Sequence, residues 1–427
     1  MSPSQDNTAT LGGARAWFVW SLSALAFGYA FVQRVAPSVM VSDLMADFAI
    51  GGGMLGVLSG LYFYPYVFLQ IPLGALLDRL GARVLLVTAL TMAGVGSALF
   101  GVAESVWLAY LGRGLVGAGS AVGFLASLAL AGRWFPPRRF ALMAGLTMVS
   151  GMTFGVLGQG PMALVVEAVG WRHSQFGLAG AAFLLAALVA LIVRNGPPGE
   201  VREEHTAMTW GQLAAASRDA LSRWIVWKVA LVAAAMSGPM LVFGGLWGTP
   251  YLMETYGLDK AQAAFTVSII LAGWAVGAPL SGWLSDVLNR RKGLVLAGCG
   301  AMTLAIAAIV VLPGLPLWVV MALLALTGFG GSFMVLTFAI VREQVPPALG
   351  GTALGAVNSM TVMSGAVLQP AVGIALDALW DGRMAAGSRL YGTTDYQLAF
   401  GLMLATSVAG FVLAVILPGD GEASSNY

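Results

Sequence analysis

The sequence is poor in the residues that carry most enzyme chemistry. Among 427 residues it has one cysteine and two histidines, and charged residues make up only 9% of the chain. The single cysteine, Cys299, cannot form an internal disulfide and lies in an apolar run, where it serves as small helix filler. The sequence has no glycine-rich nucleotide loop, metal-ligand cluster or serine, histidine and acid set. It therefore indicates no enzyme, cofactor or metal site, and its net charge of +2 indicates no nucleic-acid partner.

Apolar residues, by contrast, make up 59% of the chain, which is more than a single globular core needs. A helix needs about 20 apolar residues to cross a bilayer, and long runs without two-residue alternation exclude barrel strands. Such runs fall at residues 16–40, 53–76, 83–102, 106–131, 140–165, 175–193, 225–250, 262–284, 293–312, 316–341, 351–376 and 396–417. We expect an all-α integral membrane protein of twelve transmembrane helices, surrounded by the lipid bilayer.

Lysine and arginine side chains near the ends of these runs predict the orientation, because cytoplasmic loops carry the excess of positive charge. With the N-terminus inside, the cytoplasmic segments hold Arg15, Arg79, Arg83, Arg133, Arg138, Arg139, Arg194, Arg202, Arg218, Arg223, Lys228, Arg290, Arg291, Lys292 and Arg342. The opposite segments hold only Arg172, Lys260, Arg383 and Arg389. The first run is longer than a signal-peptide core and lacks a small-residue cleavage pattern. We expect a multi-pass protein of the cell inner membrane, with its first span retained and both termini cytoplasmic.

The two halves of the chain repeat each other. Gly145, Gly155 and Gln159 recur as Gly355, Gly365 and Gln369 at one constant offset, and Pro136 and Pro137 recur as Pro346 and Pro347. The longest polar interval lies between the halves, and its segment 209–224 mixes alanines and charges as an amphipathic surface helix does. We therefore expect two pseudo-symmetric six-helix bundles, residues 1–194 and 225–427, joined by a cytoplasmic linker at 195–224.

The turn after the second run carries a recognisable motif. It reads Gly-Ala-Leu-Leu-Asp-Arg-Leu-Gly-Ala-Arg from residue 74 to 83, and a weaker copy in the second half holds Asp286 and Arg290. The motif resembles the signature loop of the major facilitator superfamily, and the glycine-rich stretch around Arg113 is similar to the fourth-helix motif of that family. The resemblance implies two halves that rock about a central cavity. It also implies a conformational switch, formed by Asp78, Arg79, Arg83, Asp286 and Arg290, that latches the cytoplasmic side while the cavity faces outward.

Two arginines lie within apolar runs, where a charge is costly and usually functional. Arg34 in the first run and Arg113 in the fourth fall at comparable depths, and no acid lies in the middle of any run. A guanidinium matches the planar fork of a carboxylate or a phosphate. Both arginines are therefore candidates for binding an anionic substrate, although Arg34 could also snorkel to the interface and Arg113 could have a structural role. The first-helix arginine resembles that of the organophosphate and organic-anion branches of the family.

The lack of a mid-span acid also bears on coupling. Gln33 and Ser120 stand where some anion symporters of the family have acids. This favours exchange, facilitated flux, or symport in which the substrate itself carries the proton.

Further polar and aromatic side chains complete the predicted binding site. Tyr29 lies in the first run; Tyr62, Tyr66 and Gln70 share one face of the second. The remaining candidates are Phe243 and Trp247 in the seventh run and Asn358 in the eleventh. Helix packing, an interfacial aromatic belt and a helix-to-helix hydrogen bond are the alternative roles for these side chains.

The sequence thus predicts a secondary active or facilitative transporter, expected to be a monomer, that moves a small organic anion, a carboxylate or a phosphate ester. An exporter of drug-like or siderophore-like amphipathic compounds is the alternative within the same class. A non-transporting receptor or a lipid flippase is the alternative from another class.

Overall fold

The computed structural model describes residues 11–197, 210–312, 314–346 and 349–419, and within these ranges it has twelve helices long and apolar enough to cross a membrane. The first half consists of α1 (Ala14–Val35), η2 (Ala36–Val39), α2 (Val41–Phe48), α3 (Gly52–Gly60), α4 (Phe63–Gly101), α5 (Val106–Ser120), α6 (Gly123–Trp134), η3 (Pro137–Arg139), α7 (Phe140–Leu157) and α8 (Gly160–Ile192). Helix α9 (Trp210–Ser222) follows. The second half consists of α10 (Trp224–Pro239), η4 (Met240–Trp247), α11 (Gly248–Tyr256), α12 (Lys260–Leu288), α13 (Arg291–Val311), α14 (Leu317–Ser332), α15 (Val335–Glu343), α16 (Gly350–Leu379), strands β1 (Met384–Ala385) and β2 (Ser388–Arg389), and α17 (Thr393–Val415).

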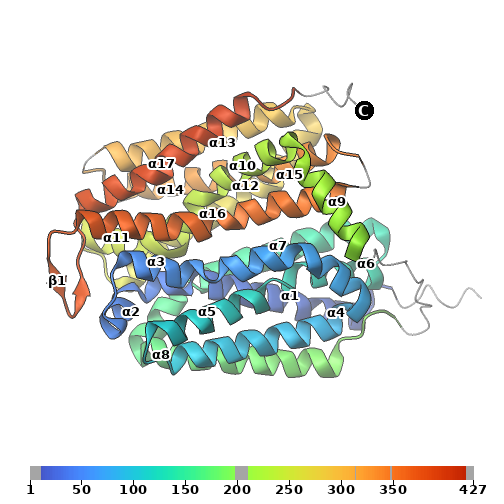
Figure 1. Ribbon diagram of the computed structural model, residues 1–427, viewed down its shortest axis with the longest axis horizontal. Helices are drawn as coiled ribbons and strands as arrows, with labels where there is room; N and C mark the ends of the chain where they lie inside the picture. The colour runs from blue at the N-terminus through green and yellow to red at the C-terminus, as the bar shows by residue number, and fades with distance from the viewer. Residues whose placement is uncertain (1–10, 198–209, 313, 347–348, 420–427) are drawn as a thin grey trace, which may run out of the picture.

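These elements form two bundles that lie one above the other in Figure 1. In the first bundle α4 packs on α5 and α8, and α1 packs on α6 and α7; in the second, α12 packs on α14, and α10 packs on α16 and α17. The bundles meet where α16 contacts α3 and α4, and where α12 contacts α7 and α8. The β1–β2 hairpin projects from one end of the molecule and α9 lies at the other (Figure 1). We refer to these as the hairpin end and the linker end.

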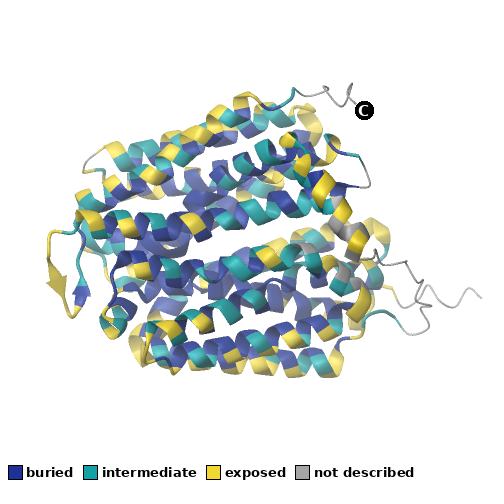
Figure 2. Cartoon of the chain, viewed as in Figure 1, coloured by how far each residue is buried: buried dark blue, intermediate teal, exposed yellow. Residues whose placement is uncertain are grey.

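Burial follows the two-bundle arrangement. Buried residues line the inner faces of the helices, and exposed residues lie on the outer surfaces (Figure 2). Many of the exposed residues are large and apolar, among them Trp107, Leu191 and Leu304, each more than 70% exposed. Exposed apolar surface on this scale fits a lipid environment rather than water.

Two turns between membrane spans are single glycines. Gly81 interrupts α4 with φ 80° and ψ 160°, and Gly170 interrupts α8 with φ 79° and ψ 161°. Only glycine adopts this backbone conformation without strain. The side chain of Asn195 packs against Gly81 and accepts a hydrogen bond of 2.9 Å from the main-chain nitrogen of Arg83. It thereby caps the helix that begins after the turn.

Glycines show where the second span, formed by α3 and the start of α4, touches α16. A Cβ atom on Gly56 would lie 2.6 Å from the carbonyl oxygen of Gln369, and a Cβ atom on Gly60 would lie 3.2 Å from that of Ala366. Gly355 is on the same face of α16 as Ala366, about three helical turns closer to the linker end. No described atom lies within 4 Å of a Cβ atom built there. α16 is therefore packed along α3 at the hairpin end, and its linker-end part around Gly355 is open.

The contact of α12 with α7 and α8 is also packed at the hairpin end and open at the linker end. At the hairpin end, Gly160 packs against the ring of Phe265, and a Cβ atom on Gly155 would lie 3.3 Å from Leu271. Towards the linker end, Gly145 on α7 has nothing within 4 Å of a built Cβ atom. Both contacts between the bundles thus close at the hairpin end.

Candidate functional site

A buried hydrogen-bonded group joins α1 to α4. The side-chain amide of Gln33 donates to the hydroxyl of Tyr29 and to the hydroxyl of Ser97, at 2.6 Å in each case. Tyr29 and Gln33 are one turn apart on α1 and so share a face. Gln33 and Ser97 are 0% exposed, and the Oε1 atom of Gln33 has no hydrogen-bond partner among the described residues. Ser97 was not predicted, because a lone serine in an apolar helix carries no distinguishing signal.

Arg113 is held against this group from α5. Its Nη1 atom donates to the main-chain carbonyl of Gln33 at 3.0 Å, and its guanidinium carbon lies 5.3 Å from the centre of the Tyr62 ring. The residue is 1% exposed, yet its Nε and Nη2 atoms have no hydrogen-bond partner in the described part of the chain. Two donors of a buried cation are therefore unsatisfied, which is unusual for a purely structural arginine.

Arg34 also lies close to Tyr62, and to Tyr66 one turn further along. Its guanidinium carbon is 5.8 Å from the Tyr62 ring centre, 5.7 Å from that of Tyr66 and 4.4 Å from that of Phe31. The Tyr62 and Tyr66 rings stack at 6.3 Å, and the Tyr62 hydroxyl donates to the carbonyl of Ala30 at 2.9 Å. The Nε atom of Arg34 has no hydrogen-bond partner among the described residues. Arg34 is thus buried in the protein rather than snorkelling to the interface.

Five of the predicted binding residues therefore form one cluster: Tyr29, Arg34, Tyr62, Tyr66 and Arg113. Gln70, one turn beyond Tyr66, contacts its side chain. No ion pair to either arginine occurs within the ranges that the structure describes. We call this group the arginine cluster. Its two uncompensated cations and its free N–H donors suit an anionic group.

The remaining predicted binding residues lie elsewhere in the second half. Phe243 packs edge-on against Tyr251 and tilted against Phe400, and Trp247 donates its indole N–H to the carbonyl of Gln369 at 3.0 Å. Both belong to the eight-residue π-helix η4 and are fully buried. Asn358 is partly buried on α16. A role for these three residues in substrate binding stays a prediction.

The predicted switch residues lie at the linker end. The side chain of Asp78 is outside the described residues, and Arg79 is exposed. Arg83 donates its guanidinium to the carbonyl of Ala190, so this contact stays within the first half. Asp286 and Arg290 are exposed in the second half. Their role as a switch also stays a prediction.

Two glutamines close the hairpin end above the arginine cluster. Gln159, at the junction of α7 and α8, donates its side-chain amide to the carbonyl of Gly244 in η4 and accepts a bond of 3.2 Å from the hydroxyl of Ser38. Gln369 on α16 donates to the carbonyl of Leu241, also in η4, at 2.7 Å. A π-helix leaves the usual helical carbonyl partners misaligned, which explains how η4 can accept both bonds.

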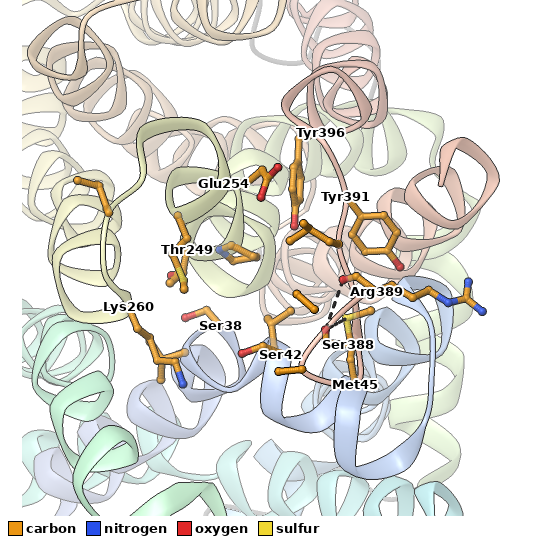
Figure 3. Close-up of a pocket in the computed structure, with 18 of the residues that line it drawn as sticks. Ser38, Ser42, Met45, Thr249, Glu254, Lys260, Ser388, Arg389, Tyr391 and Tyr396 are labelled. Atoms are coloured by element: carbon orange, nitrogen blue, oxygen red, sulfur yellow. Dashed lines mark hydrogen bonds between the residues drawn. The ribbon is translucent and has the colours of Figure 1, made fainter. Parts of the chain in front are cut away.

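A cavity of about 420 Å³ lies at the hairpin end, beyond these glutamines (Figure 3). Both halves line it, the first with Ser38 and Ser42, and the second with Thr249, Lys260 and Tyr396. The Nζ atom of Lys260 forms a 2.8 Å ion pair with Asp43, which ties the halves together beside the cavity. Ser38, which lines the cavity, is four residues beyond Arg34 in the sequence and donates to Gln159.

A twelve-helix membrane protein built of two repeated bundles, with a buried polar cluster between helices of one bundle, has the architecture of a secondary transporter. The sequence profile of the major facilitator superfamily matches residues 22–370 and 240–426. The chain belongs to the major facilitator superfamily, a family of transporters and not of enzymes.

Curated relatives and solved structures are similar over most of the chain. A probable sulfoacetate transporter of Cupriavidus necator is 24% identical over 66% of this chain and 68% of its own length. The gentisate transporter of Corynebacterium glutamicum is 25% identical over 78% of this chain and 76% of its own length. The D-galactonate transporter of Escherichia coli is 24% identical over 80% of this chain and 85% of its own length.

Solved structures share the fold. The crystal structure of a bacterial homologue of the human lysosomal transporter Spinster, inward-facing and unoccupied, has a TM-score of 0.74 at 18% identity and covers 95% of this chain and 96% of that one. The nucleoside transporter NupG has a TM-score of 0.73 at 14% identity, covering 94% and 99%.

Proposed function

We propose that this protein transports a small organic anion, a carboxylate or a phosphate ester, with Arg34 as its main charge partner. The observation that carries the proposal is the pair of guanidiniums close to Tyr62, in which three nitrogen atoms have no described hydrogen-bond partner and neither guanidinium has a described ion pair. Burying a cation without a counter-charge is unfavourable unless a ligand supplies that charge during function. The names of the relatives support the choice, because sulfoacetate, gentisate and galactonate are all organic anions.

In the proposed cycle the halves, residues 1–194 and 225–427, rock about the arginine cluster, and residues 195–224 link them in the cytoplasm. The protein acts as a monomer in the cell inner membrane, with both termini cytoplasmic. The linker end then faces the cytoplasm. On this proposal, helices packed at the hairpin end and apart at the linker end represent an inward-facing state.

Flux measurements in proteoliposomes test this function. Purified protein is reconstituted, and uptake of labelled carboxylates and phosphate esters is followed with and without a pH gradient, and with and without internal counter-substrate. We expect at least one anion class to be taken up faster than in empty liposomes. Stimulation by internal anion without pH dependence would identify exchange. Uptake of cationic or neutral compounds, with no anion moving under any condition, would show that the anion proposal is wrong.

The same assay separates the alternatives. An exporter of amphipathic compounds would keep its transport when Arg34 is replaced by alanine, because an apolar substrate needs no cation. A receptor or flippase would bind a ligand without concentrating it. The structure favours neither alternative over the anion carrier, since the buried arginine cluster would then have no counter-charge at any stage.

A further inference from the structure

The carboxylate of Asp377, near the hairpin-end terminus of α16, is the acceptor for four donors. Its Oδ1 atom accepts from the main-chain nitrogen of Gly52 at 2.9 Å, from Nη1 of Arg389 at 2.9 Å and from the hydroxyl of Tyr391 at 2.6 Å. Its Oδ2 atom accepts from the main-chain nitrogen of Gly53 at 2.8 Å. Arg389 and Tyr391 belong to the same half as Asp377, but Gly52 and Gly53 belong to the other.

Gly52 and Gly53 are the first two residues of α3, and α3 has no side-chain cap of its own. The N-terminus of a helix has unpaired N–H groups and a partial positive charge, both of which a carboxylate stabilises. Asp377 therefore supplies, from the second half, the cap that a helix of the first half lacks. Charge-assisted bonds of this kind are about twice as strong as neutral ones.

Glycines at the start of α3 allow this close approach. A Cβ atom on Gly51 would lie 2.6 Å from the Asp377 carboxylate, and one on Gly52 would lie 2.9 Å from the carbonyl oxygen of Gly373. Only glycines allow the backbone of α3 to come so close to α16. Burial, and then the hydrogen bond to Asp377, raise the pKa of the Tyr391 hydroxyl, so this group remains a donor to the carboxylate.

We propose that Asp377 and the N-terminus of α3 form a latch that holds the hairpin end closed in this state. The proposal rests on the alternating access described under the proposed function. The bonds to Gly52 and Gly53 cross between the halves, so they are lost when α3 and α16 separate to open the hairpin end. Arg389 stays with Asp377 and orients its carboxylate, and the Tyr391 hydroxyl both donates to that carboxylate and accepts from the Gly52 nitrogen at 2.9 Å. The latch lies at the hairpin end, opposite to the end where the predicted switch residues lie.

Cysteine accessibility tests the latch. Cys299 is the only cysteine and is buried, so Cys299→Ala gives a cysteine-free background. Thr249→Cys reports on the hairpin end, because Thr249 lines the cavity, is 1% exposed and has no hydrogen-bond partner to lose. Gly355→Cys reports on the linker end, where a built Cβ atom meets nothing. Each reporter is labelled with a maleimide in purified protein, so no substrate is needed and the result does not depend on which molecule the protein carries.

We expect Asp377→Asn to raise the labelling rate of Thr249→Cys several-fold and to lower that of Gly355→Cys. Tyr391→Phe removes one hydroxyl and leaves the carboxylate; it should shift both reporters in the same directions by less. The matched control is Asp381→Asn, since Asp381 is on the same connection but, among the described residues, bonds only to Arg383. Unchanged labelling in both latch variants would overturn the proposal. Faster labelling at both reporters would overturn it as well, because it indicates a loosened fold rather than a shift between two states.

Discussion

Gln159 and Gln369 occupy equivalent positions in the two repeats, and each donates its side-chain amide to a main-chain carbonyl of the same π-helix, η4. The consequences differ, because η4 belongs to the second half. The bond from Gln159 to Gly244 crosses between the halves, whereas the bond from Gln369 to Leu241 stays within one. One symmetric pair of residues thus performs two tasks, holding the hairpin end closed and shaping η4.

This difference predicts that the two equivalent substitutions have different effects. Gln159→Ala should shift the protein towards a hairpin-open state by about 1–2 kcal/mol, the size of a hydrogen bond between membrane helices. Gln369→Ala should lower thermal stability by a similar amount without moving the two ends in opposite directions. The cysteine reporters at positions 249 and 355 measure the first effect, and thermal unfolding in detergent measures the second. Equal reciprocal shifts in both variants would contradict the assignment.

Arg34 should control substrate affinity through its charge. Replacing it by alanine removes one of two uncompensated guanidiniums, so kcat/KM for the transported anion should fall about 30-fold or more, equivalent to ~2 kcal/mol. Arg34→Lys keeps the charge but loses the planar fork and should retain part of the activity. Initial uptake rates into proteoliposomes give both values. Arg138→Ala, which removes an exposed arginine at the linker end, is the matched control and should transport normally.

The wild-type protein has no carboxyl group in the middle of a predicted span. Gln33→Glu would introduce one, whose titration could affect transport. The new carboxyl would lie beside the hydroxyls of Tyr29 and Ser97, and next to the carbonyl that Arg113 binds. When ionised, it competes with the substrate for the guanidiniums; when protonated, it is neutral like the amide. KM should therefore rise as the pH increases through the pKa of the new carboxyl and return towards the wild-type value below it.

Uptake measured across a pH series tests this, with Gln33→Met as the control. Methionine removes the polar contacts without adding a charge, so it should change KM by a factor that does not vary with pH. A flat pH profile for Gln33→Glu would show that this position does not communicate electrostatically with the substrate.

The number of spans and the repeat could be predicted because they depend on local properties of the sequence. Runs of apolar residues long enough to cross a bilayer identify the helices without tertiary information. The turns between the spans were harder to predict from the sequence. The polar stretch from residue 74 to 83 looks like a loop, yet α4 continues through it except at Gly81. A single residue with positive φ leaves no pattern that distinguishes it from the other glycines of so glycine-rich a chain.

Part of the arginine cluster could also be predicted from the sequence. Arg34 and Arg113 are conspicuous because charge is rare in membrane spans, and comparable depth suggested that they lie near each other. Asp377 gave no such signal, because it lies at the end of a span where an acid is ordinary. Its importance comes from Gly52 and Gly53, more than three hundred residues away, and such a pairing depends on how α3 and α16 pack.

The Gly81 turn should tolerate substitution poorly, because it combines a positive φ with a close side-chain neighbour. At φ 80° and ψ 160° an alanine is strained by about 1–3 kcal/mol. Its Cβ atom would also strike the side chain of Asn195 and displace the cap on Arg83, which is worth about 1 kcal/mol more. Gly81→Ala should therefore lower the free energy of unfolding by ~2–4 kcal/mol. Gly180→Ala is the control, because it lies within α8 with nothing near its Cβ atom and gains helix propensity.

A double variant separates the two causes of that loss. Asn195→Ala removes both the cap and the obstacle, so adding it to Gly81→Ala relieves the clash but leaves the backbone strain. If the strain dominates, the double variant should be no more stable than Gly81→Ala in thermal unfolding. If the clash dominates, the second substitution should restore stability even though Asn195→Ala alone destabilises. Only the first outcome fits a turn whose conformation, rather than its packing, requires glycine.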